Sequence, residues 1–257
     1  MVDQQIATSF NLIGTKINLL SHEQILKQMS QWVCTRSTGH IVVVANTHVV
    51  MESRQNPALG EALAAASLVI PDGMPIVIAA RSRGYPLRAR ADGPGLMLKA
   101  LTRENCQAWR HYFYGGKPEV LSALRQRYPK AQIAGVYAPP FCPLTAEEDV
   151  RVVEEINSSR ADVLWVGLGC PKQELWMFEH ANRLQVPVML GVGQAFDILA
   201  GVKKRAPHWM CALGLEWLYR LISEPRRLWK RYLLNNPWFV WLYLREQAGL
   251  IFHPKRK

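Results

Sequence analysis

The chain has 257 residues, of which 49% are hydrophobic, and its formal net charge is +11. This length allows one large α/β domain, or a domain with an appendage, around a substantial core. The five cysteines are odd in number and form no C-x-x-C pair, which argues against a disulfide framework or a zinc site and favours a reducing compartment. The sequence predicts neither a signal peptide nor a spanning stretch of about 18 apolar residues.

Predicted strands and helices alternate as far as about residue 200. Short apolar runs predict strands at 41–45, 67–70, 111–114, 132–137, 162–168 and 187–192. Helices are expected over about 48–66, 75–82, 118–128 and 145–157, the last of them opened by a capping box of Thr145 and Glu148. Pro171 suits the first turn of a further helix. The alternation predicts an α/β fold over residues 1–202, with a Rossmann-like, mostly parallel sheet and helices on both faces.

Residues 203–257 differ from the rest in charge and composition, and we expect them to form a helical, membrane-associating appendage. They contain twelve Lys or Arg against three Asp or Glu, which places +9 of the net charge here, together with five of the nine tryptophans. Such a basic, aromatic segment suits either anionic lipid headgroups or a nucleic-acid backbone. One predicted helix carries an apolar stripe at Trp209, Leu213, Trp217 and Leu221.

A second helix of the appendage is expected after Pro225. Its wheel separates a cationic arc from an apolar arc, namely Arg226, Arg227, Lys230 and Arg231 against Leu228, Trp229, Tyr232 and Leu233. The run WFVWLYL (238–244) follows Pro237 and is too short to span a bilayer. We expect the segment after Ser223 to contribute little to the core, so that its deletion leaves a folded domain.

Two polar residues follow the first two predicted strands. Asn46 comes after the first strand and Asp72 after the second, between Pro71 and Gly73. Ligands of open parallel sheets bind at the carboxyl ends of the strands, so these side chains can face one crevice. Asp72 either aims its carboxylate into that crevice or caps the next helix, and its position alone leaves both alternatives open.

Three further loops contain candidate ligand-binding residues. Arg90, in the loop RARADGPG (88–95), either binds a ligand or is solvated. Gly115 and Gly116 follow a strand and form either a phosphate-binding loop or a plain turn. Gln173, in GLGCPKQE (167–174), either presents its amide at a helix N-terminus, where anions bind, or caps that helix.

Several common motifs are absent from the sequence. There is no G-x-G-x-x-G, no G-x-x-x-x-G-K-[ST], no H-E-x-x-H and no Asp-x-Asp pair. Dehydrogenase and P-loop classes are therefore disfavoured, and we expect neither a metal ion nor a cofactor. Arg, Lys and backbone N–H groups would then have to stabilise any diphosphate leaving group.

Five segments together resemble the WecG/TagA/CpsF family of glycosyltransferases, over about residues 10–232. They are SLVIPDGMPIV (67–77), YFYGGKPEV (112–120), DVLWVGLGCPKQELW (162–176), GVGQAFDILAG (191–201) and KRAPHWMCALGLEWLYRLISEPRRLWKRY (204–232). The resemblance implies an inverting, metal-independent enzyme that moves a hexose-type sugar from a UDP donor to a polyprenyl-diphosphate-linked sugar. It implies a pathway such as wall teichoic acid, enterobacterial common antigen or exopolysaccharide synthesis.

The resemblance also implies roles for individual residues. Asp72 matches the catalytic base, Asn46 a pocket asparagine, Arg90 a loop arginine and Gln173 the glutamine of the P-K-Q-E motif. The arginines that close over the diphosphate at the membrane match positions of the appendage, namely Arg220, Arg227 and either Lys230 or Arg231.

Three departures from the family pattern bear on the donor. Val44 stands where a threonine is usual, Gly93-Pro94-Gly95 replaces G-x-D, and Gln194 replaces the second glycine of G-V-G-G. On the expectation that all three lie near the sugar pocket, with Gln194 contacting substrate, they favour a UDP-glucose donor and the β-1,4-glucosyltransferase branch. The alternative donor is UDP-N-acetylmannosamine or its uronic acid.

The expected partners are the UDP-sugar, the lipid-linked acceptor and an anionic membrane surface. The protein would then be peripheral, at the cytoplasmic face of the inner membrane. A homo-oligomer remains an open alternative. Rival hypotheses of other classes are a nucleic-acid-binding module that uses the basic tail and a nucleotide-sugar-binding scaffold without catalysis.

Overall fold

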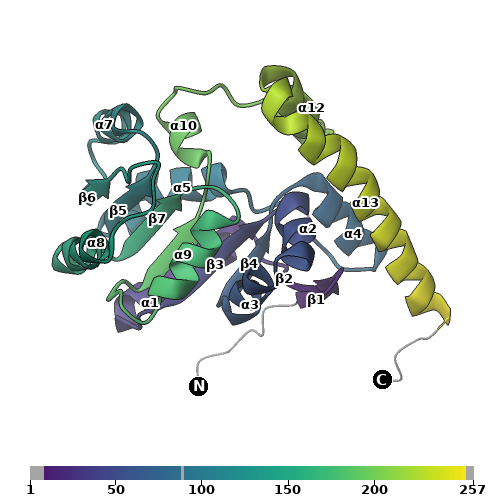
Figure 1. The fold of residues 1–257 in the computed structure, drawn as a ribbon, viewed down its shortest axis with the longest axis horizontal. Helices are drawn as coiled ribbons and strands as arrows, with labels where there is room; N and C mark the ends of the chain where they lie inside the picture. Colours follow the sequence, from purple (N-terminus) through teal and green to yellow (C-terminus); the bar gives the residue numbers. More distant parts are fainter. Residues whose placement is uncertain (1–8, 88–89, 253–257) are drawn as a thin grey trace.

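The computed structural model describes residues 9–87 and 90–252, without the side chains of residues 208, 212, 231 and 250–252. Six strands form one parallel sheet in the order β4-β3-β8-β7-β5-β6 (Figure 1). The strands are β3 (His40–Ala45), β4 (Leu68–Pro71), β5 (Arg110–Gly115), β6 (Gln132–Tyr137), β7 (Val163–Gly167) and β8 (Val188–Gly191). The predicted α/β fold with a parallel sheet is confirmed, and each predicted strand is present to within two residues at either end.

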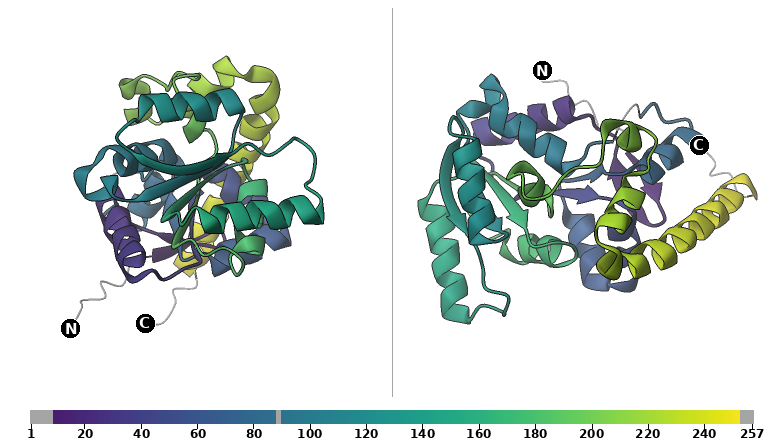
Figure 2. Two further views of the ribbon diagram at one scale, coloured as in Figure 1. Left: turned by 90° about the vertical axis from the view of Figure 1, so that its left-hand side faces the viewer. Right: turned by 90° about the horizontal axis from the view of Figure 1, so that it is seen from above.

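Helices cover both faces of the sheet, because side chains alternate along its strands (Figure 2). On β3, Ile41 and Val43 face one core cluster, whereas Val42 and Val44 face the other. The first face is covered by α2 (Thr47–Gln55), α3 (Pro57–Ala65), α4 (Met74–Ser82), α8 (Ala146–Ser158), α9 (Lys172–His180) and part of α13 (Pro225–Phe252). The second face is covered by α1 (His22–Thr35), α5 (Gly93–Thr102), α6 (Glu104–Gln107), α7 (Pro118–Arg127) and α10 (Ala195–Leu199).

An antiparallel hairpin of β1 (Ser9–Leu12) and β2 (Thr15–Asn18) was not predicted from the sequence. It lies beside β4, the edge strand of the main sheet, where the Asn18 side chain accepts the backbone N–H of Val69 at 2.8 Å. The hairpin therefore covers a sheet edge that would otherwise expose its backbone N–H groups. Each hairpin strand has only four residues, too few for a clear alternation.

Two of the expected helices are interrupted. The stretch predicted over 48–66 is divided between α2 and α3, because Asn56 precedes Pro57 and takes an extended conformation in which it caps α3. The stripe from Trp209 to Leu221 is also not one helix. Trp209 lies in α11 (His208–Ala212), and Trp217 and Leu221 lie in α12 (Glu216–Ser223). Leu213 lies between the two helices, beside Gly214, which has a positive φ of 74°. A Cβ atom there would lie 2.9 Å from the Cβ of Met74, so the interruption lets the chain approach α4 closely.

The last helix, α13, contradicts one expectation about the appendage. It has 28 residues in all and contains Pro237 in its interior. Phe239 and Leu242 are buried in the main core, and Glu246 accepts the N–H of Ile13 at 3.1 Å and pairs with Arg83 at 2.5 Å. The expectation that this segment contributes little to the core is therefore wrong. The division of the chain at residue 202 stays a prediction.

The domain buries only part of the apolar arc predicted for the start of α13. Leu228 is buried, whereas Trp229 and Leu233 are exposed, as are Arg226 and Lys230. Burial against the domain thus selects one line of the helix, and the open side mixes aromatic, aliphatic and cationic side chains. No helix among residues 9–87 and 90–252 is both long and apolar enough to cross a membrane.

Candidate active site

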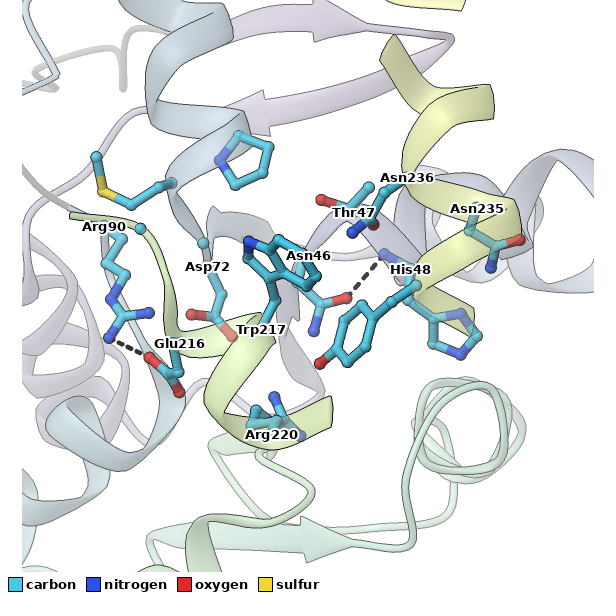
Figure 3. A pocket seen from close by; sticks show the side chains of 15 residues that line it. Asn46, Thr47, His48, Asp72, Arg90, Glu216, Trp217, Arg220, Asn235 and Asn236 are labelled. Atoms are coloured by element: carbon cyan, nitrogen blue, oxygen red, sulfur yellow. Dashed lines mark hydrogen bonds and ion pairs between the residues drawn. The ribbon is translucent and has the colours of Figure 1, made fainter. Parts of the chain in front are cut away.

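The carboxyl ends of β3 and β4 open into a cleft beneath α12 and α13 (Figure 3). Ala45 at the end of β3 pairs with Pro71 at the end of β4, so the residues that follow them, Asn46 and Asp72, lie side by side. Lining side chains come from both the sheet domain and the last two helices: Asn46, Thr47, His48, Asp72, Gly73, Met74, Pro75, Arg90, Gly214, Glu216, Trp217, Arg220, Tyr232, Asn235 and Asn236.

Asp72 lies at the base of this cleft and aims its carboxylate into it (Figure 3). Its backbone N–H donates to Ala45 at 2.7 Å, which continues the strand pairing by one residue. The next helix begins at Met74 with Gly73 as its cap residue and has no side-chain cap, so the capping alternative for Asp72 does not apply. No described residue forms a hydrogen bond with the carboxylate, which leaves its oxygens available to a ligand.

The surroundings of Asp72 raise the pKa of its carboxyl group to about 7. Burial is the main cause, because a desolvated carboxylate loses its hydration. The negative charges of Asp92 and Glu216 add to this effect, and the positive charges of Arg90 and Arg220 oppose it. The side chain still reaches solvent through the mouth of the cleft, so it can exchange protons. A carboxyl group with these properties is suited to general-base chemistry near neutral pH.

Asn46 has a structural role as well as a place in the cleft. Its Oδ1 caps α2 by accepting the N–H groups of His48 at 3.0 Å and Val49 at 3.3 Å. These bonds fix the side chain with its amide beside Asp72 (Figure 3). The sequence thus correctly predicts that Asn46 and Asp72 share one crevice.

Arg90 lies on the opposite wall of the cleft and pairs with Glu216, the first residue of α12. Its Nη2 is 2.5 Å from Oε2 of Glu216, and the two side chains are only 14% and 21% exposed. The neighbouring carboxylates Asp72, Glu216 and Asp92 raise the pKa of the guanidinium further, against the effect of burial. Arg90 is therefore not a solvated loop arginine, because Glu216 of α12 holds its guanidinium.

Gln194 and Arg220 are neighbours at the other end of α12. Arg220 donates to Oε1 of Gln194, and Nε2 of Gln194 donates to Glu224 at 3.2 Å. Arg220 lines the cleft of Asp72 and also a second cleft on the far side of α12, which contains Gln194 and Lys203. Gln194 does not line the cleft of Asp72.

Two other predicted site residues lie beside this cleft. Arg227 and Lys230 line an adjoining hollow that shares His48 and Asn235 with the cleft of Asp72. Arg227 pairs with Glu224 at 2.6 Å. The side chain of Arg231 is outside the part of the chain that the structure describes.

Gln173 lies away from the cleft of Asp72. It is buried, and its Oε1 accepts the N–H groups of Gly169 and Gly193, both at 3.1 Å. Its Nε2 donates to Glu174 at 2.7 Å. These bonds join the loops after β7 and β8, so in this structure Gln173 connects backbone segments.

The departures expected to mark the sugar pocket lie outside the cleft of Asp72. Val44 is buried in the core of the second sheet face. Gly93, Pro94 and Gly95 form the first turn of α5, which Asp92 caps. A Cβ on Gly95 would meet Oδ1 of Asp92 at 2.7 Å, so this glycine serves the cap. The sequence argument for a glucose donor therefore has no support in the geometry.

Sequence reasoning missed the residues that α12 and α13 contribute to the cleft, chiefly Glu216, Trp217, Tyr232 and Asn235. Glu216 and Arg220 are four residues apart, the spacing that places two side chains on one helix face. This signal could have brought Glu216 into the site together with Arg220. Within the described residues, no group of His, Cys, Asp or Glu is arranged to hold a metal ion.

The model of the glycosyl transferase WecG/TagA/CpsF family matches residues 10–251. The chain belongs to this family. Its members include a protein of Bacillus spizizenii strain W23 that is 31% identical over 218 residues, 83% of this chain and 82% of that protein. A protein of Staphylococcus aureus strain MW2 is 31% identical over 226 residues, 86% and 85% of the two chains.

Both relatives are named N-acetylglucosaminyldiphosphoundecaprenol N-acetyl-β-D-mannosaminyltransferase. The expected relationship to a glucosyltransferase branch is therefore not supported, since both relatives are named as N-acetylmannosaminyltransferases. Membership of the family makes this chain a glycosyltransferase, and neither the nucleic-acid-binding module nor the non-catalytic scaffold is retained as a hypothesis.

Proposed function

We propose that this enzyme transfers an N-acetylmannosaminyl group from its UDP donor to N-acetylglucosamine linked to polyprenyl diphosphate. The observation that supports the proposal best is the free carboxylate of Asp72, which has a pKa of about 7 and lies at the base of a cleft at the strand ends. The donor and acceptor are taken from the names of the two relatives, which align with more than four fifths of this chain. This donor replaces the UDP-glucose that the sequence favoured.

In the proposed reaction, Asp72 is the general base. It accepts the proton of the acceptor hydroxyl while that oxygen forms a bond to the anomeric carbon of the donor. The bond from this carbon to the diphosphate oxygen breaks on the opposite face and its electron pair leaves with UDP, so the configuration inverts. General-base catalysis by a well-placed group contributes about 10²–10⁴-fold to the rate.

The departing UDP carries negative charge that the enzyme has to stabilise. Arg220 is the best-placed cation for this task, because it lines the cleft of Asp72 and, among the described residues, donates to the neutral Gln194 and forms no ion pair. Arg227 and Lys230 border the adjoining hollow and can approach a diphosphate that extends from the cleft. Charge-assisted hydrogen bonds from such groups stabilise a diphosphate without a metal ion. The remaining candidate substrate-binding residues stay predictions, namely Asn46, Arg90, Gln173, Gln194 and Arg231.

The acceptor is anchored in a membrane, and the open side of α13 suits such a surface. Its exposed residues are Arg226, Arg227, Trp229, Lys230, Leu233, Leu234, Trp238, Val240, Trp241 and Leu244. Aromatic and aliphatic side chains enter the interface, and each cation near an anionic surface contributes about 1 kcal/mol. We therefore propose a peripheral enzyme on the anionic, cytoplasmic face of the inner membrane.

A transfer assay with a panel of donors tests this function. The full chain is incubated with UDP-N-acetylmannosamine, UDP-N-acetylglucosamine or UDP-glucose and a short-chain polyprenyl-diphosphate N-acetylglucosamine, and products are identified by mass. We expect the first donor to be used at least about tenfold better in kcat/KM, a difference of about 1.4 kcal/mol. Preference for UDP-glucose would restore the original donor hypothesis, and transfer by Asp72→Asn at the wild-type rate would remove the base from the mechanism.

A further inference from the structure

Glu216 joins the last helices to the catalytic cleft through one buried ion pair. Its Oε2 accepts from Nη2 of Arg90 at 2.5 Å and also from the thiol of Cys211 at 3.6 Å. Glu216 opens α12, whereas Arg90 belongs to the loop before α5, so the pair connects segments far apart in the chain (Figure 3). In the proposed reaction this carboxylate has no role of its own.

Both guanidinium groups in the cleft are engaged by partners other than Asp72. Arg90 pairs with Glu216, and Arg220 donates to Gln194. Neither forms an ion pair with Asp72, although both are close enough to lower the pKa of its carboxyl group. An arginine without a partner would pair with a desolvated carboxylate in two parallel hydrogen bonds. Such a pair would occupy the oxygens that a base needs and would stabilise its ionised form.

We propose that Glu216 is a positioning residue that holds Arg90 away from Asp72 and so keeps the Asp72 carboxylate available as a base. This inference rests on the proposed function of Asp72. Because Glu216 stands on α12, the base is complete only when α12 is seated over the cleft. The carboxylate of Glu216 is itself committed to Arg90, which is why Asp72, rather than Glu216, is the base.

The charges around Asp72 give the sign of the effect. Asp92 and Glu216 raise the pKa of Asp72, while Arg90 and Arg220 lower it, and His48 and Tyr232 also line the cleft. Neutralising Glu216 removes one raising charge and releases Arg90 to approach Asp72. Both changes lower the pKa of Asp72, so they make it a weaker base.

The test uses Glu216→Gln, which keeps the shape of the side chain and removes its charge. The titration of Asp72 is followed in the full chain by carboxyl ¹³C NMR with labelled aspartate, and Asp72→Asn identifies the signal. We expect the titration to move at least about half a unit toward acid, since a nearby opposite charge commonly shifts a carboxyl by ~1–3 units. The acid limb of kcat/KM should move with it, and kcat should fall about tenfold while KM changes less.

Two further variants make the result specific. The double variant Arg90→Gln with Glu216→Gln replaces an ion pair of no net charge by two uncharged side chains. The titration of Asp72 should therefore return to within a few tenths of a unit of wild type. Glu224→Gln, at the other end of α12, removes a carboxylate that is not among the main causes of the Asp72 shift, so it should leave the titration unchanged. The double variant also serves if Glu216→Gln does not fold, because it contains no unpaired buried charge.

An unchanged or alkaline-shifted Asp72 titration in Glu216→Gln would overturn the inference. Failure of the double variant to restore the titration would overturn the part assigned to Arg90. The NMR titration needs no turnover, so the two proposals fail separately. A shifted titration in an enzyme that transfers no tested sugar leaves the role of Glu216 intact and rejects the proposed function.

Discussion

The carboxylate of Asp72 and the imidazole of His111 are both ionisable groups buried by the same sheet, with different consequences. Asp72 lies at a strand end, where a cleft gives it access to solvent, and its pKa is raised to about 7. His111 lies within β5, is fully buried, and accepts the N–H of Trp165 at its Nδ1 at 3.1 Å. Burial lowers the pKa of His111 to about 4. We therefore expect Asp72 to affect catalysis and His111 to affect the stability of the fold.

The raised pKa of Asp72 predicts the pH dependence of the enzyme. A general base acts in its ionised form, so kcat/KM should rise with pH through about 7 and then level off. Asp72→Asn should retain the fold and donor binding and lose at least about 10²-fold in turnover. A pH–rate series for the wild type, with donor binding to the variant measured by calorimetry, checks both. A rate that is flat between pH 5 and 8 would contradict the assignment.

His111 should make the protein less stable in mild acid. Its unfolded-state pKa of 6.5 lies above the folded value of about 4, so the unfolded chain binds the extra proton and stability falls as the pH drops through this range. A shift of this size corresponds to about 3 kcal/mol. His111→Gln can still accept from Trp165 but does not titrate, so we expect a smaller loss of unfolding free energy from pH 7 to pH 4.

Denaturant unfolding at several pH values provides the measurement for His111→Gln. The raised pKa of Asp72 acts with the opposite sign over the same range, since it favours folding at low pH. The difference between variant and wild type cancels this contribution. Equal acid sensitivity of the two proteins would show that His111 does not carry the effect.

At the scale of the elements, α13 has a docked line and an open side. Leu228, Phe239 and Leu242 are buried, whereas Trp238 and Trp241 are half exposed and stack on each other with ring centroids 4.9 Å apart. Phe239 and Trp238 are thus adjacent in the sequence and opposite in environment. Substitutions at Phe239 and at Trp238 can therefore separate the contribution of core packing from that of the proposed membrane contact.

We predict opposite effects for substitutions on the two sides of α13. Phe239→Ala should cost about 3–5 kcal/mol in unfolding free energy, as for other large buried side chains. Trp238→Ala with Trp241→Ala should change stability by less than about 1 kcal/mol and weaken binding to anionic vesicles severalfold. Deletion after Ser223 should now destabilise the domain, because it uncovers the core around Phe239. A stable, soluble truncated protein would contradict this account of α13.

The elements that the sequence predicts well are those with strong periodicity. All six parallel strands are apolar runs bounded by polar or turn residues, and the capping box of Thr145 and Glu148 forms as expected. The division between α2 and α3 could have been predicted from Asn56-Pro57, because a residue before proline avoids helical backbone angles. The burial of Phe239 could not be predicted from the sequence, because the side on which a helix contacts the core depends on how it packs against other elements.

At the scale of the whole molecule, the site combines strand ends that topology brings together with helices that dock from a distance. Asn46 and Asp72 could be paired from the sequence because neighbouring parallel strands end at one edge. Glu216, Trp217 and Tyr232 could not, since nothing local to α12 or α13 shows which edge of the sheet they cover. Gln173 illustrates the reverse case, a family residue that matches by motif but binds backbone beneath the loops.

The charge balance of the molecule predicts activity without a divalent metal. Arginine and lysine side chains border the cleft, and no described cluster of ligands is arranged for a metal ion. We expect full transfer activity in excess EDTA, compared with the same assay supplemented with Mg²⁺ or Mn²⁺. Activity abolished by chelation and restored by either ion would mean that cationic side chains alone do not stabilise the leaving group.

The docking of α13 has a further geometric consequence. At about 1.5 Å per residue, its 28 residues form a rod of ~42 Å. Because one line of the rod is fixed to the domain, the cleft keeps a constant position relative to the open side of α13, which we propose rests on the membrane. A glycan extends outward from its diphosphate by one sugar at a time, so each added unit moves the growing end farther from the lipid. On the proposed membrane contact, the packing of α13 on the domain would therefore set the distance between the lipid surface and the sugar that the cleft can reach.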